Sequence, residues 1–168
     1  VPFALALPAL ALAQAYPAKP ISVIVPFAAG GGSDNVARMI TTKLTERTGK
    51  TFVIENRGGG GTNIGNEAAA RAKPDGYTFL LAQFTLPVNP YLYPNLRYSA
   101  EKDFAPVSMI SRSPIALVVL PGFAASDLKG FVEQVRSSPG KHSYASFGQG
   151  TTAHIFGETL KLNAGLDM

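Results

Sequence analysis

The stretch PFAAGGGSDNVARM, residues 26–39, decides the fold of this chain. It begins inside the β-branched run ISVIVPF of residues 21–27, which predicts a buried strand. Three glycines follow, and then a helical pattern that Ser33 or Asp34 can cap and that Gly49 can end. The expected apolar face of this helix consists of Val36, Ala37, Ile40 and Leu44. Because a triple glycine is costly to order, we expect close approach to the backbone at this turn.

The order of strand, glycine turn and helix recurs along the chain. Further strands are predicted at residues 51–56, 77–82, 115–120 and 143–147. The glycine turns lie at residues 30–32, 58–61 and 148–150. Ser126 is expected to cap one later helix and Thr151 to begin another, whereas the proline-rich residues 83–106 are expected to form a long connection with short helical turns. Alternating strands and helices predict a mainly parallel sheet that is covered on both faces.

Composition excludes several classes of protein. The chain has 168 residues, of which 46% are hydrophobic and 15% charged, so it can bury a core and is not expected to be disordered. Its net charge of +4 is not concentrated in a Lys/Arg cluster, which argues against nucleic-acid binding. With no cysteine, and with His142 and His154 as the only histidines, we predict neither a metal site nor a cofactor.

The first 15 residues suggest a cleaved export signal, and the last residues suggest a truncated chain. VPFALALPALALAQA, residues 1–15, resembles the tail of a secretory signal that is cut before Tyr16, and it is too short to span a bilayer. This predicts export, and the lack of cysteine is compatible with a bacterial periplasm. The chain ends on AGLDM, directly after a helical pattern, so we expect it to be a fragment of a longer protein.

The glycine turns favour an anion site without basic side chains. A helix N-terminus carries unpaired N–H groups and the positive end of the helix dipole, and glycine lets a ligand approach them. One exposed dipole contact contributes about 0.3–1 kcal/mol, whereas micromolar binding needs about 8 kcal/mol. Two turns closing on one ligand, with hydroxyl groups from Ser33, Ser146 and Thr151, would come closer. A plain tight connection between strand and helix explains the glycines equally well.

Enzyme motifs are incomplete. Gly49-Lys50-Thr51 has the ending of a phosphate-binding loop, but Leu44 stands where the first glycine is required. Tyr144 likewise replaces the first glycine of a nucleophile elbow around Ser146. The spacing of Gly148, Gly150 and Ala153 fits the dinucleotide-binding pattern only loosely. An exported hydrolase-like enzyme that uses Ser146 and His154 stays open as the alternative function.

Three stretches together carry a family resemblance. YPAKPISVIVPFAAGGGSDNVAR, ENRGGGGTNIGNEAAARAKPDGYTFLLA and SYASFGQGTTAHIFGETLK occur in this order. The chain resembles the periplasmic substrate-binding proteins of tripartite tricarboxylate transporters, the TctC or Bug family. The resemblance implies an α/β, two-lobed periplasmic-binding-protein fold of type II, incomplete at its C-terminus. It places the first lobe at residues 16–118 and the start of the second at residues 119–168.

The resemblance also implies a function without chemistry on the ligand. Such a receptor binds a small carboxylate, whether a dicarboxylate or tricarboxylate, an amino acid or an aromatic acid, and delivers it to membrane permease subunits. The implied ligand-binding positions of the first lobe are Phe27, Ala28, Gly31, Ser33, Asp34, Asn63, Gln83 and Thr85. Those of the second lobe are Ser146, Gly148, Thr151 and His154.

Overall fold

The computed structural model describes residues 16–168, so the expected secretory signal at residues 1–15 lies outside the described residues. Three short strands form a parallel sheet in the order β2-β1-β3. They are β1 (Ile21–Val25), β2 (Phe52–Asn56) and β3 (Thr78–Leu80). The central strand β1 supplies the most deeply buried apolar side chains of the sheet, namely Ile21, Ile24 and Val25. These strands confirm the three that the sequence predicts in this half of the chain.

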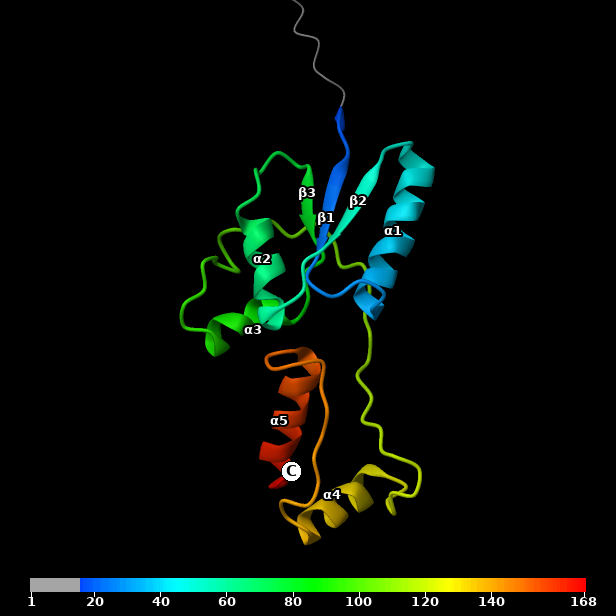
Figure 1. The fold of residues 1–168 in the computed structure, drawn as a ribbon, viewed down its shortest axis with the longest axis vertical. Coiled ribbons are helices and arrows are strands. Elements are labelled where there is room, and N and C mark those ends of the chain that lie inside the picture. Colours follow the sequence, from blue (N-terminus) through cyan, green and yellow to red (C-terminus); the bar gives the residue numbers. More distant parts are fainter. Residues whose placement is uncertain (1–15) are drawn as a thin grey trace, which may run out of the picture.

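Helices lie on both sides of the sheet (Figure 1). Helix α1 (Gly32–Thr48) packs against β1 and β2, whereas α2 (Asn63–Ala70), preceded by the short turn η1 (Gly60–Thr62), packs against β1 and β3. The crossover from β1 to β2 and the crossover from β2 to β3 run in opposite directions across the sheet. Right-handed crossovers then place the two helices on opposite faces, as the sequence predicts.

Helix α1 begins one residue before the expected caps. Its N-cap is Gly31, which has no side chain to cap with, so the expectation that Ser33 or Asp34 caps it is wrong. Both residues lie in the first turn, because Gly31 is the last extended residue and the helix begins at Gly32. At the other end Gly49 has φ 66° and its N–H donates to the Thr45 carbonyl, which confirms the predicted C-terminal glycine.

The proline-rich segment contains a regular helix. Helix α3 (Thr85–Leu92) has Pro90 in its interior, where the ring removes one backbone hydrogen bond. Thr85 and Asn89, both fully buried polar residues on one face, fix the helix through side-chain hydrogen bonds. Tertiary contacts therefore give this segment more order than the expected short helical turns.

Two predicted strands are absent. Residues 115–120 and 143–147 form no strand, and residues 105–120 are exposed throughout. The β-branched run 115–120 is extended in Figure 1, but no strand of the described chain lies beside it to accept its hydrogen bonds. A strand is stable only in a ladder with a neighbour, so the apolar sequence alone does not create one. We name residues 105–120 the linking segment.

Beyond the linking segment lie two helices, α4 (Leu128–Ser137) and α5 (Thr152–Ala164). Asp127, not the expected Ser126, caps α4, because the Asp127 carboxylate accepts the Gly130 N–H at 2.8 Å. Thr151 is the N-cap of α5, so the predicted start of that helix is confirmed. A small core joins the two helices and is built from Phe131, Val135 and Leu166, with Phe123, Leu160 and Ala164 packed against it.

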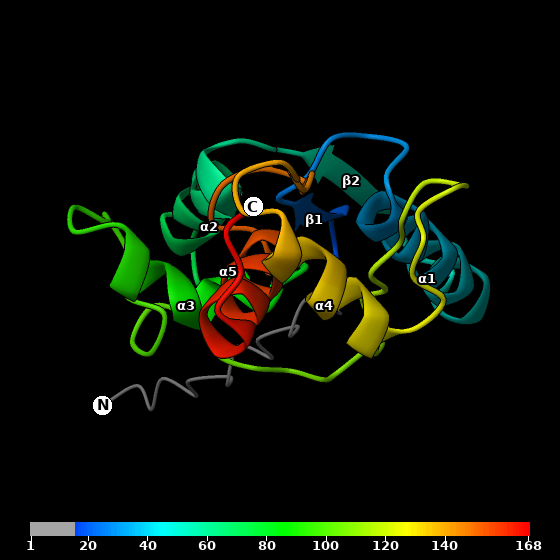
Figure 2. The same ribbon diagram turned by 90° about the horizontal axis from the view of Figure 1, so that it is seen from below.

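The molecule thus has two regions. We name residues 16–104 the sheet region and residues 121–168 the helical region. Figure 1 shows the linking segment running from one to the other, and Figure 2, seen from below, shows α4 and α5 beneath the sheet region. The tip of α5 and the loop before it are the parts of the helical region that lie nearest to α3 (Figure 1).

Candidate ligand-binding site

The carboxyl ends of the three strands meet at one edge of the sheet, and their loops are joined there. Asn56, the last residue of β2, donates from Nδ2 to the Phe27 carbonyl at 3.2 Å and to Asp34 Oδ1 at 3.0 Å. Gly58 packs on the backbone of Phe27 and Ala28, where a Cβ would lie 3.2 Å from the Ala28 nitrogen. The loops after β1 and β2 are therefore held as one unit, at the edge where open parallel sheets bind ligands.

Asp34 holds the glycine turn in place. Its carboxylate is 1% exposed and accepts hydrogen bonds from Gly30 N–H at 2.8 Å, Arg38 Nε at 2.9 Å and Asn56 Nδ2 at 3.0 Å. The hydrogen bond from Arg38, followed by those from Gly30 and Asn56, lowers the pKa of Asp34 to about 2. All of these contacts are internal, so Asp34 shapes the loop that would meet a ligand.

Ser33 and Gln83 join the loop after β3 to the first turn of α1. Gln83 Nε2 donates to Ser33 Oγ at 2.6 Å, across 50 positions of sequence. Because Ser33 Oγ accepts this bond, its own hydroxyl hydrogen is left to donate elsewhere. The N–H groups of the first turn of α1 have no acceptor within the helix. Phe27 is partly exposed, and Ala28 and Gly31 are exposed at the same edge.

Two other predicted ligand-binding residues point into a buried polar network. Asn63 Oδ1 accepts from Tyr98 Oη at 2.6 Å and from Asn89 Nδ2 at 2.7 Å. Thr85 Oγ1 is hydrogen bonded to Thr62 Oγ1 at 2.8 Å, and Thr85 is 1% exposed. This network ties η1 and α2 to α3, and it gives Asn63 and Thr85 a positioning role behind the site.

The second predicted loop forms a compact turn before α5. Thr151 Oγ1 donates to the Gly148 carbonyl at 2.6 Å, and the Gly148 N–H donates to Ser146 Oγ at 3.3 Å. His154 Nδ1 accepts the Gly150 N–H at 3.2 Å. Gly148 and Gly150 have φ of 121° and 75°, conformations that favour glycine. The structure therefore brings together all four residues predicted for this loop.

The same geometry separates the alternative catalytic pair. Ser146 Oγ is bonded to Gly148 and His154 Nδ1 to Gly150, and no hydrogen bond joins Ser146 to His154 among the residues that the structure describes. A catalytic serine needs a base within hydrogen-bond reach. The arrangement consequently gives no support to the hydrolase alternative.

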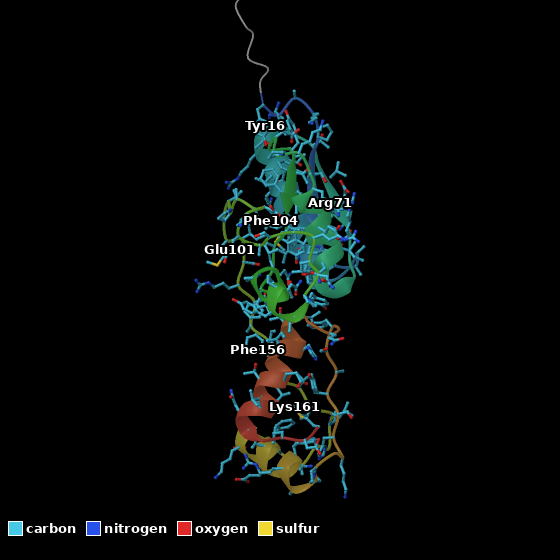
Figure 3. The ribbon with its side chains drawn as sticks, turned by 90° about the vertical axis from the view of Figure 1, so that its left-hand side faces the viewer. Tyr16, Arg71, Glu101, Phe104, Phe156 and Lys161 are labelled. Carbon is cyan, nitrogen blue, oxygen red and sulfur yellow. The ribbon has the colours of Figure 1, made fainter. Side chains whose placement is uncertain are left out.

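The two regions contact each other beside this site. The hydroxyl of Tyr93 faces the Gln149 carbonyl at 3.5 Å, and the rings of Phe84 and Phe156 stack with centroids 6.1 Å apart. Figure 3 shows Phe156 at the end of α5 that is nearest to the sheet region. A recess of about 110 Å³ lies at this contact, lined by Leu92, Tyr93, Gln149, Gly150 and His154.

Several residues that support the site were not predicted. Asn56, Asn89 and Tyr98 act through contacts between residues distant in sequence, so no local pattern marks them. The sequence weakly indicates the ion pair of Arg38 with Asp34, because Arg38 lies four positions after Asp34 on the same helix.

Within residues 16–168, no group of three or more His, Cys, Asp or Glu side chains is placed to hold a metal ion. The helices described there are all too short or too polar to cross a membrane.

Comparisons with known proteins assign the family. Residues 36–168 match the tripartite tricarboxylate transporter family receptor, TctC. A protein encoded in the tcbD–tcbE intergenic region of Pseudomonas sp. strain P51 is 36% identical over 155 residues, which are 92% of this chain and 46% of that protein. Protein BugT of Bordetella pertussis is 37% identical over 155 residues, 91% of this chain and 48% of BugT. The chain thus spans about half the length of these curated relatives.

Solved structures of known proteins also resemble this chain. Rpa4515 of R. palustris with adipate superposes with a TM-score of 0.85 at 31% identity, over 91% of this chain and 52% of that one. MatC of Rhodopseudomonas palustris with bound malate gives 0.78 at 32% identity, over 90% and 52%. The periplasmic binding protein BugD gives 0.74 at 36% identity, over 91% and 51%. These neighbours are binding proteins, not enzymes, and the superpositions cover about half of each of their chains. The chain belongs to the TctC family of tripartite tricarboxylate transporter receptors.

Proposed function

We propose that this chain forms part of an extracytoplasmic receptor for a small carboxylate, and that the ligand binds at the carboxyl ends of β1, β2 and β3. The observation that carries the proposal is the first turn of α1. Its N–H groups are uncapped, its glycines leave the backbone open, and Asn56 and Gln83 fix it from the two neighbouring loops. Such a turn favours an anion without a basic side chain.

Charge at the turn is compatible with an anionic ligand. Asp34 is the only acid of the first turn, and its charge is compensated by Arg38 and by the Gly30 and Asn56 donors. A carboxylate oxygen in front of the turn would meet N–H donors and the free hydroxyl hydrogen of Ser33, which Gln83 leaves available. Charge-assisted hydrogen bonds of this kind are about twice as strong as neutral ones.

The second half of the site comes from the loop before α5. This loop presents another helix N-terminus, with Thr151 as its N-cap, and it follows a turn organised by Ser146 and Gly148. We place the first lobe at residues 16–118 and the start of the second at residues 119–168, with the ligand between the two glycine turns. The adipate and malate in the structures of Rpa4515 and MatC support the carboxylate class.

The proposed location and partners are those that the family suggests. The receptor would act in the periplasm after export directed by residues 1–15, and it would deliver its ligand to the membrane permease subunits of a tripartite transporter. The description of BugD as a periplasmic binding protein supports this location.

Thermal-shift screening of the full-length protein against mono-, di- and tricarboxylates tests the proposal. A ligand that binds only the folded state raises the melting temperature, by an amount that grows with the ratio of its concentration to its Kd. We expect at least one carboxylate to raise it and Ser33→Ala to reduce that shift. Ser137→Ala is the matched control, because Ser137 lies on α4 and its hydroxyl donates to the Gln134 carbonyl of the same helix. No shift across the panel would contradict a carboxylate receptor.

A further inference from the structure

Tyr93 lies where the sheet region meets the helical region. It follows α3, and its hydroxyl faces the Gln149 carbonyl oxygen of the opposite region at 3.5 Å. The same phenol lies against two glycines, Gly61 from the sheet region and Gly150 from the helical region. It is not among the residues assigned above to the ligand, and the contact gives it a separate role.

Two physical reasons favour glycine at both positions, namely close contact with the Tyr93 phenol and a positive φ angle. A Cβ on Gly150 would lie 2.9 Å from the Tyr93 hydroxyl oxygen, and a Cβ on Gly61 would overlap the same atom. Their φ angles are +75° and +62°, which also disfavour any other residue. The Tyr93 ring therefore fits between two backbone turns, and a Cβ added at either glycine would displace the phenol.

Tyr93 is rigidly attached to the sheet region. Its N–H donates to the Asn89 carbonyl at 2.9 Å, and the side chain of Asn89, which is 0% exposed, donates to the Gly61 carbonyl at 2.9 Å. Asn89 and Tyr93 are one helical turn apart, and the side chains of both lie against Gly61. The next residue, Thr62, has φ +78°, a conformation that persists only where the surroundings enforce it.

A second contact between the regions lies at the other end of α3. Phe84, adjacent to Gln83, stacks on Phe156 of α5 with an interplanar angle of 29°. Both rings are about half exposed, at 48% and 52%. An aromatic pair of this size is easily separated in water, whereas the fit of Tyr93 between glycines is steric and fixes a distance.

We infer that Tyr93 is a positioning residue that sets the spacing of the two regions, by seating its phenol between Gly61 and Gly150. This places Gln149 and the loop before α5 at a defined distance from α3 and from the turn that holds Ser33. Affinity for a ligand between the two loops would then depend on Tyr93 without any contact between Tyr93 and the ligand. Only that last consequence rests on the proposed receptor function.

The distance between the regions can be measured without a ligand. The chain contains no cysteine, so cysteines introduced at Thr42 on α1 and Lys129 on α4, both exposed, can carry a pair of spin labels. The measurement is made on the full-length protein with these as its only cysteines, by pulsed electron double resonance. We expect one dominant distance in the parent, and longer, broader distributions in Gly150→Ala and in Tyr93→Ala.

Two further variants make the result specific. Tyr91→Ala removes a tyrosine of α3 that is 89% exposed, and it should leave the distribution unchanged. Tyr93→Phe keeps the ring and should retain the parent distance. Circular dichroism and the melting temperature show that each variant is folded. Distributions for Gly150→Ala and Tyr93→Ala that coincide with the parent would overturn the inference.

Failure of the inference and failure of the receptor proposal are distinguishable. If the distances respond as expected but no carboxylate raises the melting temperature, the spacing role stands and the receptor proposal falls. If carboxylates bind and the distances do not respond, the opposite holds.

Discussion

The sheet region and the helical region differ in how far their sequences determine their structures. In the sheet region every predicted strand forms. Each strand pairs with a neighbour, and the apolar side chains of the central strand β1 are buried. In the helical region and the linking segment, the runs 115–120 and 143–147 are equally strand-like in sequence but have no partner strand in the described chain. A helix forms its backbone hydrogen bonds within its own segment, whereas a strand needs a neighbouring strand to form them.

The largest expected effect tests close packing in the sheet region. In Gly65→Ala the new Cβ would lie 2.7 Å from Pro26 Cβ and 2.9 Å from the Arg57 carbonyl oxygen, so backbone must move. We expect the free energy of unfolding to fall by about 1–3 kcal/mol. Urea denaturation measures it, with Gly32→Ala as the control, since a Cβ there meets nothing within 4 Å. Equal stability of the two variants would show that α2 does not pack tightly on β1.

The next effect concerns Asp34 and is dependent on pH. The pKa of Asp34 is lowered from 3.8 to about 2, first by its hydrogen bond with Arg38. A folded-state pKa below the unfolded one stabilises the fold above the unfolded value, and that contribution is lost as pH falls toward 2. Asp34→Asn should therefore be less stable than the parent at pH 7, with the difference shrinking between pH 4 and 2. Melting temperatures across this range measure it, and a difference independent of pH would contradict the ion pair.

A smaller effect is expected for a matched glycine in the helical region. A Cβ on Gly157 would overlap the ring of Tyr144, but a side chain can move where backbone cannot. The Tyr144 hydroxyl donates to Glu158 at 2.7 Å on the surface, so the ring can shift toward solvent. Because alanine favours a helix over glycine by about 0.5–1 kcal/mol, Gly157→Ala should change stability by less than about 1 kcal/mol. A loss as large as that of Gly65→Ala would remove the contrast between the regions.

The smallest effect is expected in the linking segment. Val118 is 81% exposed and pairs with no strand, so Val118→Thr should change the stability of the 168-residue chain by less than about 0.5 kcal/mol. Chemical denaturation of this chain measures it. A loss above about 1 kcal/mol would show that the segment is packed.

The candidate site follows the same rule as the fold. The glycine turns, the start of α5 and the helix after residues 58–61 could be predicted, because glycine, threonine and alanine patterns act over a few positions. The residues that hold the turns could not, since Asn56 reaches Asp34 over 22 positions and Gln83 reaches Ser33 over 50. The inward orientation of Asn63 and Thr85 depends likewise on Tyr98 and Thr62. Local patterns thus predicted the turns of the candidate site, whereas the contacts that hold these turns depend on the tertiary structure.

We propose that backbone N–H groups at the first turn of α1 bind the carboxylate. The most direct test is to titrate the ¹⁵N-labelled full-length protein with adipate and with malate and to follow its amide resonances. Hydrogen bonding to a carboxylate moves an amide proton downfield. We expect saturable downfield shifts of the amide protons of Gly32 and Ser33, and also of residues in the loop before α5. Saturable binding that leaves Gly32 and Ser33 unchanged would contradict it.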